Sequence, residues 1–375
     1  MKIVVAIDSF KGCLSSKEAG ETVKQAIKKQ YPTYEVEVYQ IADGGEGTLS
    51  VLVQLLGAKY VSCQAHDPLM RAINGEYAIV AESKTALIEM ASVNGLPLLK
   101  EEERNPMLTS TFGTGELIKD ALDRGCQHFI IGIGGSATND AGVGLLQAIG
   151  YRFYDKKGKE IGKGGSVLPE IASWEEPDDT YCLKKSDFTI ACDVNNPFYG
   201  KNGAAYVYAR QKGADNEMIQ LLDKGLESFC NVIRKKTGID IENVPGSGAA
   251  GGMGGGMLAF LKARLRPGAD LLLELSDFVK TAQTADLIIT GEGKMDKQTL
   301  MGKIPGRIME IGKKNKVSVV GIAGKIEDYD ALEQGGFNHL YAISPISLPL
   351  ELAMKPEIAK ENIEKSIAGL LQNYK

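Results

Sequence analysis

The stretch DLIITGEGKMDKQTLMGK, residues 286–303, joins a short apolar run to a loop of glycines, acids and lysines. The run 286–290 predicts a strand, because it is short, apolar and bounded by a turn-forming segment. The loop behind it is not a nucleotide-binding P-loop, since that motif needs a glycine and a Ser or Thr where this chain has Lys297 and Ile304. What the loop does therefore depends on the strands around it.

Strands of the same kind lie toward both ends of the chain. Apolar runs at 2–8 and 35–43 flank a helical pattern near the start, and the runs 317–324 and 339–344 alternate with helical segments near the end. Alternating strands and helices are typical of a parallel sheet with helices packed on its faces. The five runs predict one open doubly wound sheet, interrupted by a large insert.

The middle of the chain has a different pattern. Alternating apolar and polar residues over 59–91 predict hairpins, and 128–134 reads as a further strand. The predicted fold class is α/β, with a discontinuous doubly wound parallel-sheet domain formed by 1–65 and 283–375. Residues 66–282 form the large inserted mixed α/β domain.

Composition restricts the class of protein. The chain has 375 residues, 43% of them hydrophobic and 24% charged, with a net charge of −5. No long basic run indicates a nucleic-acid or membrane surface, and no stretch approaches the roughly eighteen apolar residues of a membrane span. The N-terminal apolar run is too short for a signal peptide. We therefore expect a cytoplasmic protein whose partners are small molecules, with no nucleic acid and no membrane.

Histidine and cysteine chemistry is not indicated. The three histidines lie outside the glycine clusters, and the six cysteines include no C-x-x-C pair. This argues against a zinc site and against a Ser-His-Asp hydrolase. Carboxylates and lysines remain to carry any chemistry.

Five polar clusters follow or end predicted strands. They are DSFKG (8–12), ADGGEGT (42–48), GIGGSATNDAG (132–142), ACDVNNP (191–197) and GEGKMDKQT (291–299). Ligands of open α/β sheets bind beyond the carboxyl ends of the strands. One such loop is weak evidence, but five in one chain predict a ligand site.

Each cluster also has a purely structural interpretation. An aspartate at a strand end, such as Asp43, often caps the turn that follows, and Lys11 is equally well explained as a solvated lysine. Gly44 and Gly45 either make a turn or present backbone N–H groups to an anion. The glycine-rich segment 246–256 is either a hinge or a backbone cradle.

The cluster GIGGSATND has a serious alternative. Its glycines and Ala137 match G-x-G-x-x-A, and Asp155 follows about twenty residues later, as a dinucleotide site requires. That alternative predicts an NAD(P)-dependent hydroxy-acid oxidoreductase. Against it, the expected helix start is densely polar, and Asp155 falls in a predicted hairpin turn. We favour a helix N-terminus that offers Ser136 and Thr138 to a phosphate or carboxylate.

The acids fit phosphoryl transfer best. A kinase needs carboxylates to hold Mg²⁺ on the phosphates and to accept the proton of the substrate hydroxyl. Glu292 and Asp296 lie four residues apart, and Asp193 lies in another strand-end cluster. Lysines and backbone N–H groups can stabilise the transferred phosphoryl group.

A family resemblance adds to this interpretation. The segments DSFKGCLSS, ADGGEGT, NPMLTSTFGTGELI, GIGGSATNDAGVGLLQAIG, GSGAAGGMGGG, LRPGADL and GEGKMDKQTLMGKIPG, in this order, resemble the bacterial glycerate kinase family over nearly the whole chain. The resemblance implies a flavodoxin-like domain joined to a second α/β domain. It also implies ATP-dependent, Mg²⁺-dependent phosphorylation of D-glycerate, the (R) form, to 2-phosphoglycerate or 3-phosphoglycerate. The chain departs from the family pattern DPLGRP at DPLMRAI (67–73).

The resemblance and the strand-end placement together imply roles for single residues. Asp193 and Asp296 are the expected base and Mg²⁺ ligand, in an order left open, in a cleft between the domains. Further predicted groups are Lys11 as a catalytic residue; Ser9, Asp43, Ser136, Thr138 and Asn139 for the substrate; and Gly44, Gly45, Gly291, Gly293 and Lys303 for ATP. A non-catalytic protein that binds a small anion is the third class considered, and assembly as a homodimer stays open.

Overall fold

The computed structural model describes residues 1–375 except 11, 42–47, 179–180, 346 and 375. The chain divides into two compact units, each described here by itself. Unit 1 consists of Met1–Asp43 and Gly268–Lys375, and unit 2 of Gly44–Pro267. In the described part of the chain, no helix has the length and apolar character needed to cross a membrane.

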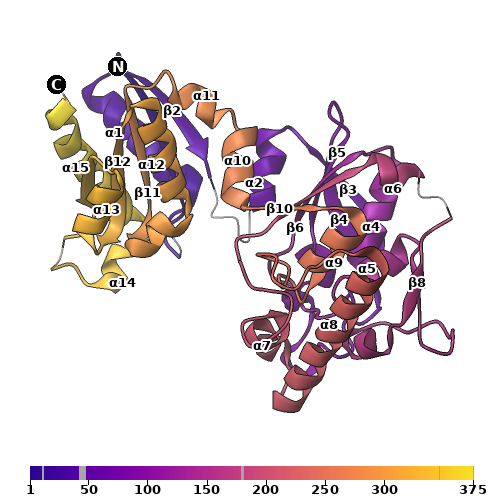
Figure 1. Ribbon diagram of the computed structural model, residues 1–375. Helices are drawn as coiled ribbons and strands as arrows, with labels where there is room; N and C mark the ends of the chain where they lie inside the picture. Colours follow the sequence, from indigo (N-terminus) through magenta and orange to yellow (C-terminus); the bar gives the residue numbers. More distant parts are fainter. Residues whose placement is uncertain (11, 42–47, 179–180, 346, 375) are drawn as a thin grey trace. The chain divides into compact units, whose positions relative to one another are not determined.

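Unit 1 contains a five-stranded parallel sheet, in the order β13-β12-β11-β1-β2 (Figure 1). This is the flavodoxin-like order, in which the direction of winding reverses between the first and third strands, here β1 and β11. The strands are β1 (Lys2–Ile7), β2 (Glu35–Gln40), β11 (Leu287–Met295), β12 (Ser318–Ile326) and β13 (His339–Ala342). The predicted discontinuous doubly wound sheet is confirmed.

Helices cover this sheet, whose strands β1, β11 and β12 are apolar and largely buried. The helices are α1 (Ser16–Gln30), α10 (Gly268–Leu275), α11 (Phe278–Ala282), α12 (Ile304–Asn315), α13 (Tyr329–Gly335), α14 (Leu350–Ala353) and α15 (Pro356–Leu370), with 3₁₀ turns η5 (Lys297–Met301) and η6 (Leu371–Tyr374). α1 and α15 contact each other and bury one core with β1, β11 and β12. α12 contacts β11 and β12, where Gly312 lets the helix approach Val319 and Ile288 closely.

The start of α1 follows from local sequence. The Ser15 hydroxyl accepts a hydrogen bond from the Glu18 N–H at 3.2 Å, and the Glu18 carboxylate accepts one from the Ser15 N–H at 3.0 Å. This reciprocal pair satisfies two backbone donors that no helical bond can reach. The helix therefore begins at Ser16, and eight residues, 8–15, connect it to the end of β1.

Unit 2 contains a six-stranded mixed sheet, in the order β10-β9-β6-β5-β4-β3. Within this sheet, β5, β6, β9 and β10 pair in parallel, whereas β3, β4 and β5 form antiparallel hairpins. The strands are β3 (Lys59–His66), β4 (Ala72–Val80), β5 (Thr85–Glu89), β6 (His128–Gly132), β9 (Asp187–Ala191) and β10 (Arg264–Arg266). A separate two-stranded antiparallel sheet consists of β7 (Arg152–Tyr154) and β8 (Ser173–Glu175). The predicted hairpins over 59–91 are confirmed.

The helices of unit 2 enclose one large core. They are α2 (Thr48–Leu55), α3 (Ala91–Asn94), α4 (Phe112–Asp123), α5 (Val143–Ala148), α6 (Tyr181–Lys185), α7 (Ala204–Tyr208), α8 (Asn216–Thr237) and α9 (Met253–Leu261), with 3₁₀ turns η1 (Leu96–Leu98), η2 (Glu101–Glu103), η3 (Gly165–Glu170) and η4 (Arg210–Lys212). Phe129 of β6 stacks on Phe188 of β9 with ring centroids 4.7 Å apart, which ties the two neighbouring strands together.

The boundaries between the units differ from those predicted. The expected limits were after residue 65 and after residue 282, but the units divide after Asp43 and after Pro267. β3 pairs along its length with β4, so α2 and β3 belong to unit 2. α11 belongs to unit 1, because Phe278 packs edge-on against Tyr39 and the Tyr39 hydroxyl contacts Thr281 Oγ1 at 2.6 Å.

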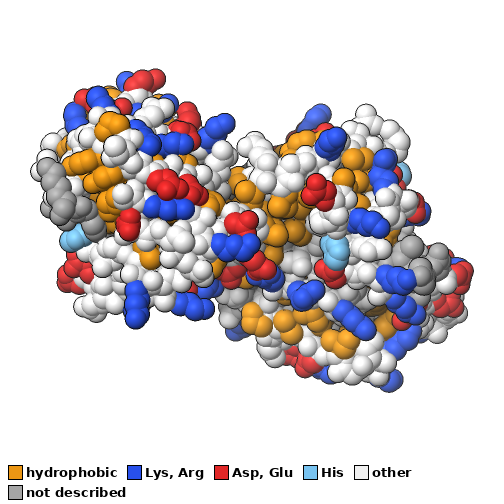
Figure 2. All heavy atoms as spheres, turned by 90° about the horizontal axis from the view of Figure 1, so that it is seen from above, with side chains coloured by type: hydrophobic (Ala, Val, Ile, Leu, Met, Phe, Trp, Pro, Cys, Tyr) orange, Lys and Arg blue, Asp and Glu red, His pale blue; other side chains and the backbone are white. Residues whose placement is uncertain are grey.

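Three further local predictions were inaccurate. β11 continues five residues past the expected end at 290, because GEGKM pairs with β12 as far as Met295. The segment 159–186, which its polar and weakly periodic sequence predicts to be a surface loop, contains η3, β8 and α6. The helix expected from about residue 139 begins only at Val143. Acidic and basic side chains are interspersed on the face of each unit drawn in Figure 2, consistent with the mixed charge of the sequence.

Candidate active site

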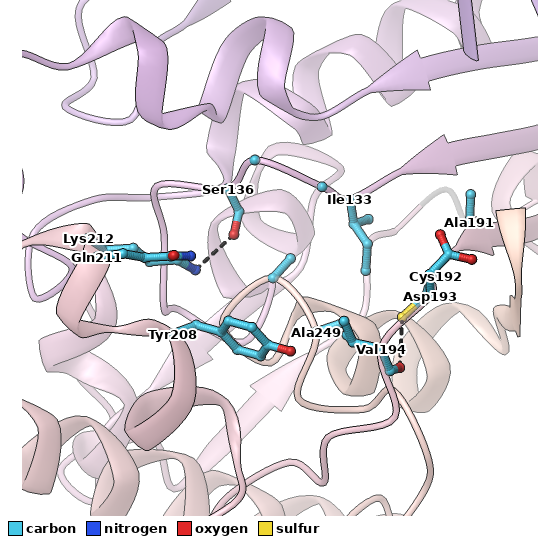
Figure 3. Close-up of a pocket in the computed structure, with 13 residues that line it drawn as sticks. Ile133, Ser136, Ala191, Cys192, Asp193, Val194, Tyr208, Gln211, Lys212 and Ala249 are labelled. Carbon is cyan, nitrogen blue, oxygen red and sulfur yellow. Dashed lines mark hydrogen bonds between the residues drawn. The ribbon is translucent and has the colours of Figure 1, made fainter. Parts of the chain in front are cut away.

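A pocket of about 240 Å³ lies in unit 2 beyond the carboxyl ends of β6 and β9 (Figure 3). The two strands are parallel neighbours, and their last paired residues are Gly132 and Ala191. The polar clusters that follow both strands therefore meet at one edge of the sheet, as their placement predicted. The lining residues are Ile133, Gly134, Gly135, Ser136, Ala191, Cys192, Asp193, Val194, Tyr208, Gln211, Lys212, Ala249 and Ala250.

Lys212 is the most unusual residue of this pocket. Its side chain is only 1% exposed, and its Nζ donates hydrogen bonds to Ser136 Oγ at 2.8 Å and to the Thr138 carbonyl at 2.6 Å. Burial lowers the pKa of Lys212 to about 7, and the negative charge of Asp140 opposes that shift. A lysine whose pKa lies near neutrality can change its charge when a ligand binds.

The loop that carries Ser136 is held in place from several sides. Ser136 forms an isolated bridge with Gly95, the Ala137 N–H donates to the Asn94 carbonyl at 2.9 Å, and Gly135 has a φ of 69°. Nothing lies within 4 Å of the point where a Cβ on Gly134 would stand. A ligand can thus approach the backbone of this loop closely, which is a common role of glycine.

Asp140 is a buried anchor beneath the same loop. Its Oδ2 accepts hydrogen bonds from the Thr111 N–H at 2.8 Å, the Thr111 hydroxyl at 3.0 Å and the Gly144 N–H at 3.2 Å. Burial raises the pKa of the Asp140 carboxyl, while these donors lower it. Asp140 fixes the segment before α5 onto the start of α4, and its negative charge acts on Lys212.

Three polar side chains near this anchor are buried without a hydrogen-bond partner among the described residues. They are the hydroxyl of Thr138, both polar atoms of the Asn139 amide and the hydroxyl of Ser247. Thr138 and Asn139 are fully buried and do not line the pocket. Sequence patterns placed them at a helix N-terminus facing a ligand, but α5 begins later and the intervening segment turns inward.

In unit 1, the segment 291–303 comprises the end of β11, the turn η5 and the residues up to α12. It begins beside β1, at the point where the winding of the sheet reverses. The Asp8 N–H donates to the Gly291 carbonyl at 2.8 Å, which joins the end of β1 to β11. A Cβ on Gly291 would stand 1.9 Å from the Ile322 carbonyl oxygen, so the close approach of β12 requires glycine there. In flavodoxin-like sheets, ligands bind at this reversal point.

The acids of this segment have different surroundings. Glu292 is 6% exposed and pairs with Lys303, whereas Asp296 precedes η5 and accepts a hydrogen bond from the Gln298 N–H at 2.9 Å. That backbone bond, together with Lys294 at 3.2 Å, holds the pKa of Asp296 below its ordinary value despite some desolvation. Asp296 is therefore an ionised carboxylate at neutral pH.

The remaining predicted residues fall into three groups. Ser136 and Asp193 line the same pocket of unit 2. Ser9, Gly291, Gly293, Asp296 and Lys303 all belong to unit 1: Ser9 follows β1, the two glycines lie within β11, and Asp296 and Lys303 follow β11. Lys11, Asp43, Gly44 and Gly45 lie outside the described residues.

Sequence reasoning missed Lys212. Its neighbourhood, ARQKGAD, looks like a solvated turn before a helix, and no motif marks it. Its main partners, Ser136 and Thr138, are more than seventy residues away in the chain. A buried position without local apolar periodicity leaves no signal in a single sequence.

Acidic side chains alone do not form a complete metal site. Over the described residues, no group of three or more His, Cys, Asp or Glu side chains is arranged to hold a metal ion. Mg²⁺ in kinases is commonly held by one or two carboxylates together with phosphate oxygens and water. The ionised Asp296 fits a site in which one or two carboxylates hold Mg²⁺ together with phosphate oxygens and water.

The chain thus combines a flavodoxin-like sheet with a second α/β unit whose pocket contains a lysine, a serine and an aspartate, an arrangement suited to binding a small anion. Residues 3–375 match the model of the glycerate kinase family. The chain belongs to that family and is a kinase.

Relatives of known name cover nearly all of the chain. It is 41% identical to a glycerate kinase of Bacillus subtilis (strain 168), over 100% of this chain and 98% of the relative. It is 38% identical to a glycerate 2-kinase of Escherichia coli (strain K12), over 92% and 90% of the two chains. A crystal structure of glycerate kinase 2 from Salmonella typhimurium LT2 matches with a TM-score of 0.86 and 37% identity, covering 100% of this chain and 98% of the other.

The dinucleotide alternative is wrong, because the chain is a kinase. The structure gives a physical reason as well. Asp155 lies at a turn, where its backbone N–H donates to the Lys159 carbonyl at 2.9 Å, and β7 before it pairs with β8 in a separate two-stranded sheet. The acid that would bind a ribose is therefore not at the end of a second strand of the parallel sheet.

Proposed function

We propose that this protein transfers the γ-phosphoryl group of ATP, as its Mg²⁺ complex, to the 2-hydroxyl of D-glycerate, giving 2-phosphoglycerate and ADP. The observation that carries the proposal is the pocket beyond β6 and β9 in a chain of the glycerate kinase family. The name of the Escherichia coli relative, glycerate 2-kinase, supports the choice of the 2-hydroxyl.

Asp193 is the proposed general base. It lines the pocket with Ser136, so a hydroxyl bound there lies within the same small volume as the carboxylate. A carboxylate that accepts the hydroxyl proton during transfer is the common arrangement in kinases. Ser136 and the backbone N–H groups of Gly134 and Gly135 are the proposed donors to the substrate.

Asp296 is the proposed ligand for Mg²⁺. Its low pKa keeps it ionised, and Lys294 and Lys303 add positive charge in the same segment. Bound Mg²⁺ would supply charge neutralisation on the phosphates. The chain's own contribution is to hold the carboxylate at the end of β11, beside the reversal point of the sheet.

A substrate panel tests this function. The purified protein is incubated with ATP and Mg²⁺ and with D-glycerate, L-glycerate, lactate or glycerol, and ADP release is followed by a coupled assay. We expect release that depends on D-glycerate, with NMR of the product showing phosphate on the 2-hydroxyl. Phosphate on the 3-hydroxyl would contradict the proposed position, and release independent of D-glycerate would contradict the substrate.

A further inference from the structure

We propose that Lys212 binds the carboxylate of the acceptor substrate, and thereby makes a hydroxy acid, and not a neutral polyol, the preferred substrate of the unit 2 pocket. This inference rests on the proposed function and adds a specificity-determining residue to it.

Lys212 is placed with little freedom. It ends η4, and the following Gly213 adopts the left-handed conformation with a φ of 95°. A Cβ on Gly213 would stand 2.0 Å from the Arg104 carbonyl oxygen, so the chain packs tightly directly after the lysine. An ammonium group held this rigidly loses little further entropy when a ligand binds.

The hydrogen bonds leave donors for a ligand. An ammonium group has three N–H donors, and Lys212 uses two of them on Ser136 Oγ and on the Thr138 carbonyl. Because the Ser136 oxygen accepts from the lysine, its own O–H is free to donate elsewhere. One N–H of Lys212 and the O–H of Ser136 can therefore bind the two oxygens of a single carboxylate.

The charges of the pocket give a substrate one orientation. Figure 3 shows Lys212 and Ser136 on one side of the pocket and Asp193 on the other, with Tyr208 and Ala249 between them. A hydroxy acid whose carboxylate contacts Lys212 directs its hydroxyl groups toward Asp193. The opposite orientation would bring two carboxylates together, which is unfavourable in a partly buried site.

The buried charge also lacks a contact partner of opposite sign. Asp140 acts on Lys212 through space, but among the described residues the two make no ion pair, and the Asp140 oxygens accept from Thr111, Gly142 and Gly144. A buried charge is costly unless it is paired. A carboxylate ligand would supply the missing partner, and it would favour the charged form of a lysine whose pKa burial has lowered to about 7.

A pair of nearly isosteric substrates tests the inference. D-glyceramide has the shape of D-glycerate but carries no charge, so the ratio of kcat/KM for the two compounds measures recognition of the carboxylate. In Lys212→Met we expect kcat/KM for D-glycerate to fall by about 100-fold, the size of a lost charge-assisted hydrogen bond, while the value for D-glyceramide changes by less than about threefold. Equal losses for both compounds would show a merely structural role and overturn the inference.

Lys236→Met is the matched control. Lys236 also donates to a backbone carbonyl of unit 2, that of Trp174 at 2.5 Å, but it does not line the pocket. We expect Lys236→Met to keep the wild-type ratio of kcat/KM for D-glycerate and D-glyceramide. If the wild-type protein does not phosphorylate D-glycerate, the proposed function fails. If it does, but the ratio of kcat/KM for D-glycerate and D-glyceramide is unchanged in Lys212→Met, only the inference about Lys212 fails.

A second measurement needs no substitution, should Lys212→Met not fold. Calorimetric titration of the wild-type protein with D-glycerate, with a non-hydrolysable ATP analogue present, is repeated at about pH 8 in buffers of different ionisation enthalpy. We expect proton uptake with D-glycerate but none with D-glyceramide, because the carboxylate restores the charge of the lysine. Binding of D-glycerate without proton uptake would overturn the inference.

Discussion

Glu292 of β11 and Lys303, the residue directly before α12, form an ion pair with 2.9 Å between Glu292 Oε2 and Lys303 Nζ. The other carboxylate oxygen accepts a hydrogen bond from the Thr299 hydroxyl at 2.7 Å. The Gly-Lys pair that resembles part of a P-loop thus binds an acid of the preceding strand. The arrangement ties β11 to the start of α12.

Removing the lysine of this pair should destabilise unit 1. In Lys303→Met, the Glu292 carboxylate stays buried and loses its cation, and we expect the free energy of unfolding to fall by about 2 kcal/mol, less than for a fully buried pair because Lys303 is partly exposed. Chemical denaturation measures the change. Lys297→Met, which removes an exposed lysine, should change stability by less than about 0.5 kcal/mol. An equal loss in both variants would contradict a specific role for the pair.

Asp140 should be required for the stability of unit 2. Asp140→Asn keeps one acceptor oxygen, so its NH₂ group must face either the N–H donors of Thr111 and Gly144 or the N–H of Gly142. We expect a loss of about 2–3 kcal/mol, measured by thermal or chemical unfolding. Asp123→Asn, at an exposed surface pair with Lys119, is the control and should be nearly neutral. Unchanged stability of Asp140→Asn would show that the anchor is dispensable.

Binding of D-glycerate should weaken as the pH rises above about 7. The pKa of Lys212 is lowered to about 7 by burial, so the ammonium is present below that pH and is lost above it. Among the described residues, Asp140 acts on Lys212 through space, and Asp193 lines the same pocket. Burial raises the pKa of Cys192 and of Tyr208, which line the same pocket and therefore stay neutral near pH 7.

The measurement is KM for D-glycerate from about pH 6 to about pH 9. Since one charge is lost, we expect KM to increase by up to about tenfold per pH unit above the pKa of the free enzyme. Lys212→Met should show a high KM without this dependence. The same slope in that variant would assign the titration to another group.

Asp193 and Asp296 should both be needed for turnover. Conversion of either acid to its amide, Asp193→Asn or Asp296→Asn, is expected to lower kcat by at least about 100-fold, or about 2.7 kcal/mol of activation free energy. Raising the Mg²⁺ concentration should partly restore Asp296→Asn but not Asp193→Asn. If both folded variants keep nearly normal turnover, the proposed roles are wrong.

Gly291 should tolerate no side chain. Gly291→Ala places a Cβ 1.9 Å from the Ile322 carbonyl oxygen, so β11 and β12 must separate, and we expect a loss of several kcal/mol or failure to fold. Gly369 lies in α15 of the same unit with open space around it. Gly369→Ala should therefore raise stability by about 0.5–1 kcal/mol. Solubility and circular dichroism melting distinguish the two outcomes.

Much of the fold could be predicted because it depends on local patterns. Short apolar runs identified the strands of unit 1, and their alternation with helices identified a parallel sheet. The boundary between the units was missed at β3, whose alternating residues look the same whichever sheet the strand joins. Its assignment depends on pairing with β4, a contact between segments that sequence periodicity does not describe.

The strand-end clusters could be recognised for a related reason. Parallel strands end at a common edge of a sheet, so polar clusters behind neighbouring strands meet there. Which clusters share a pocket depends on strand order, and only the structure places Ser136 and Asp193 together, with Lys212 beside Ser136. Thr138 and Asn139, expected at the ligand, turn inward because α5 begins only at Val143.

The sequence by itself determined the class of fold, the family and the strand ends at which polar groups gather, because these follow from short-range periodicity and from motifs in a set order. Only the tertiary structure decided that Lys212 is buried beside Ser136 and that Lys303 neutralises Glu292. The properties of a charged side chain depend on its burial and on its neighbours in space. Long-range packing determines both the burial and the spatial neighbours of such a side chain, and neither can be read from the residues adjacent to it in the chain.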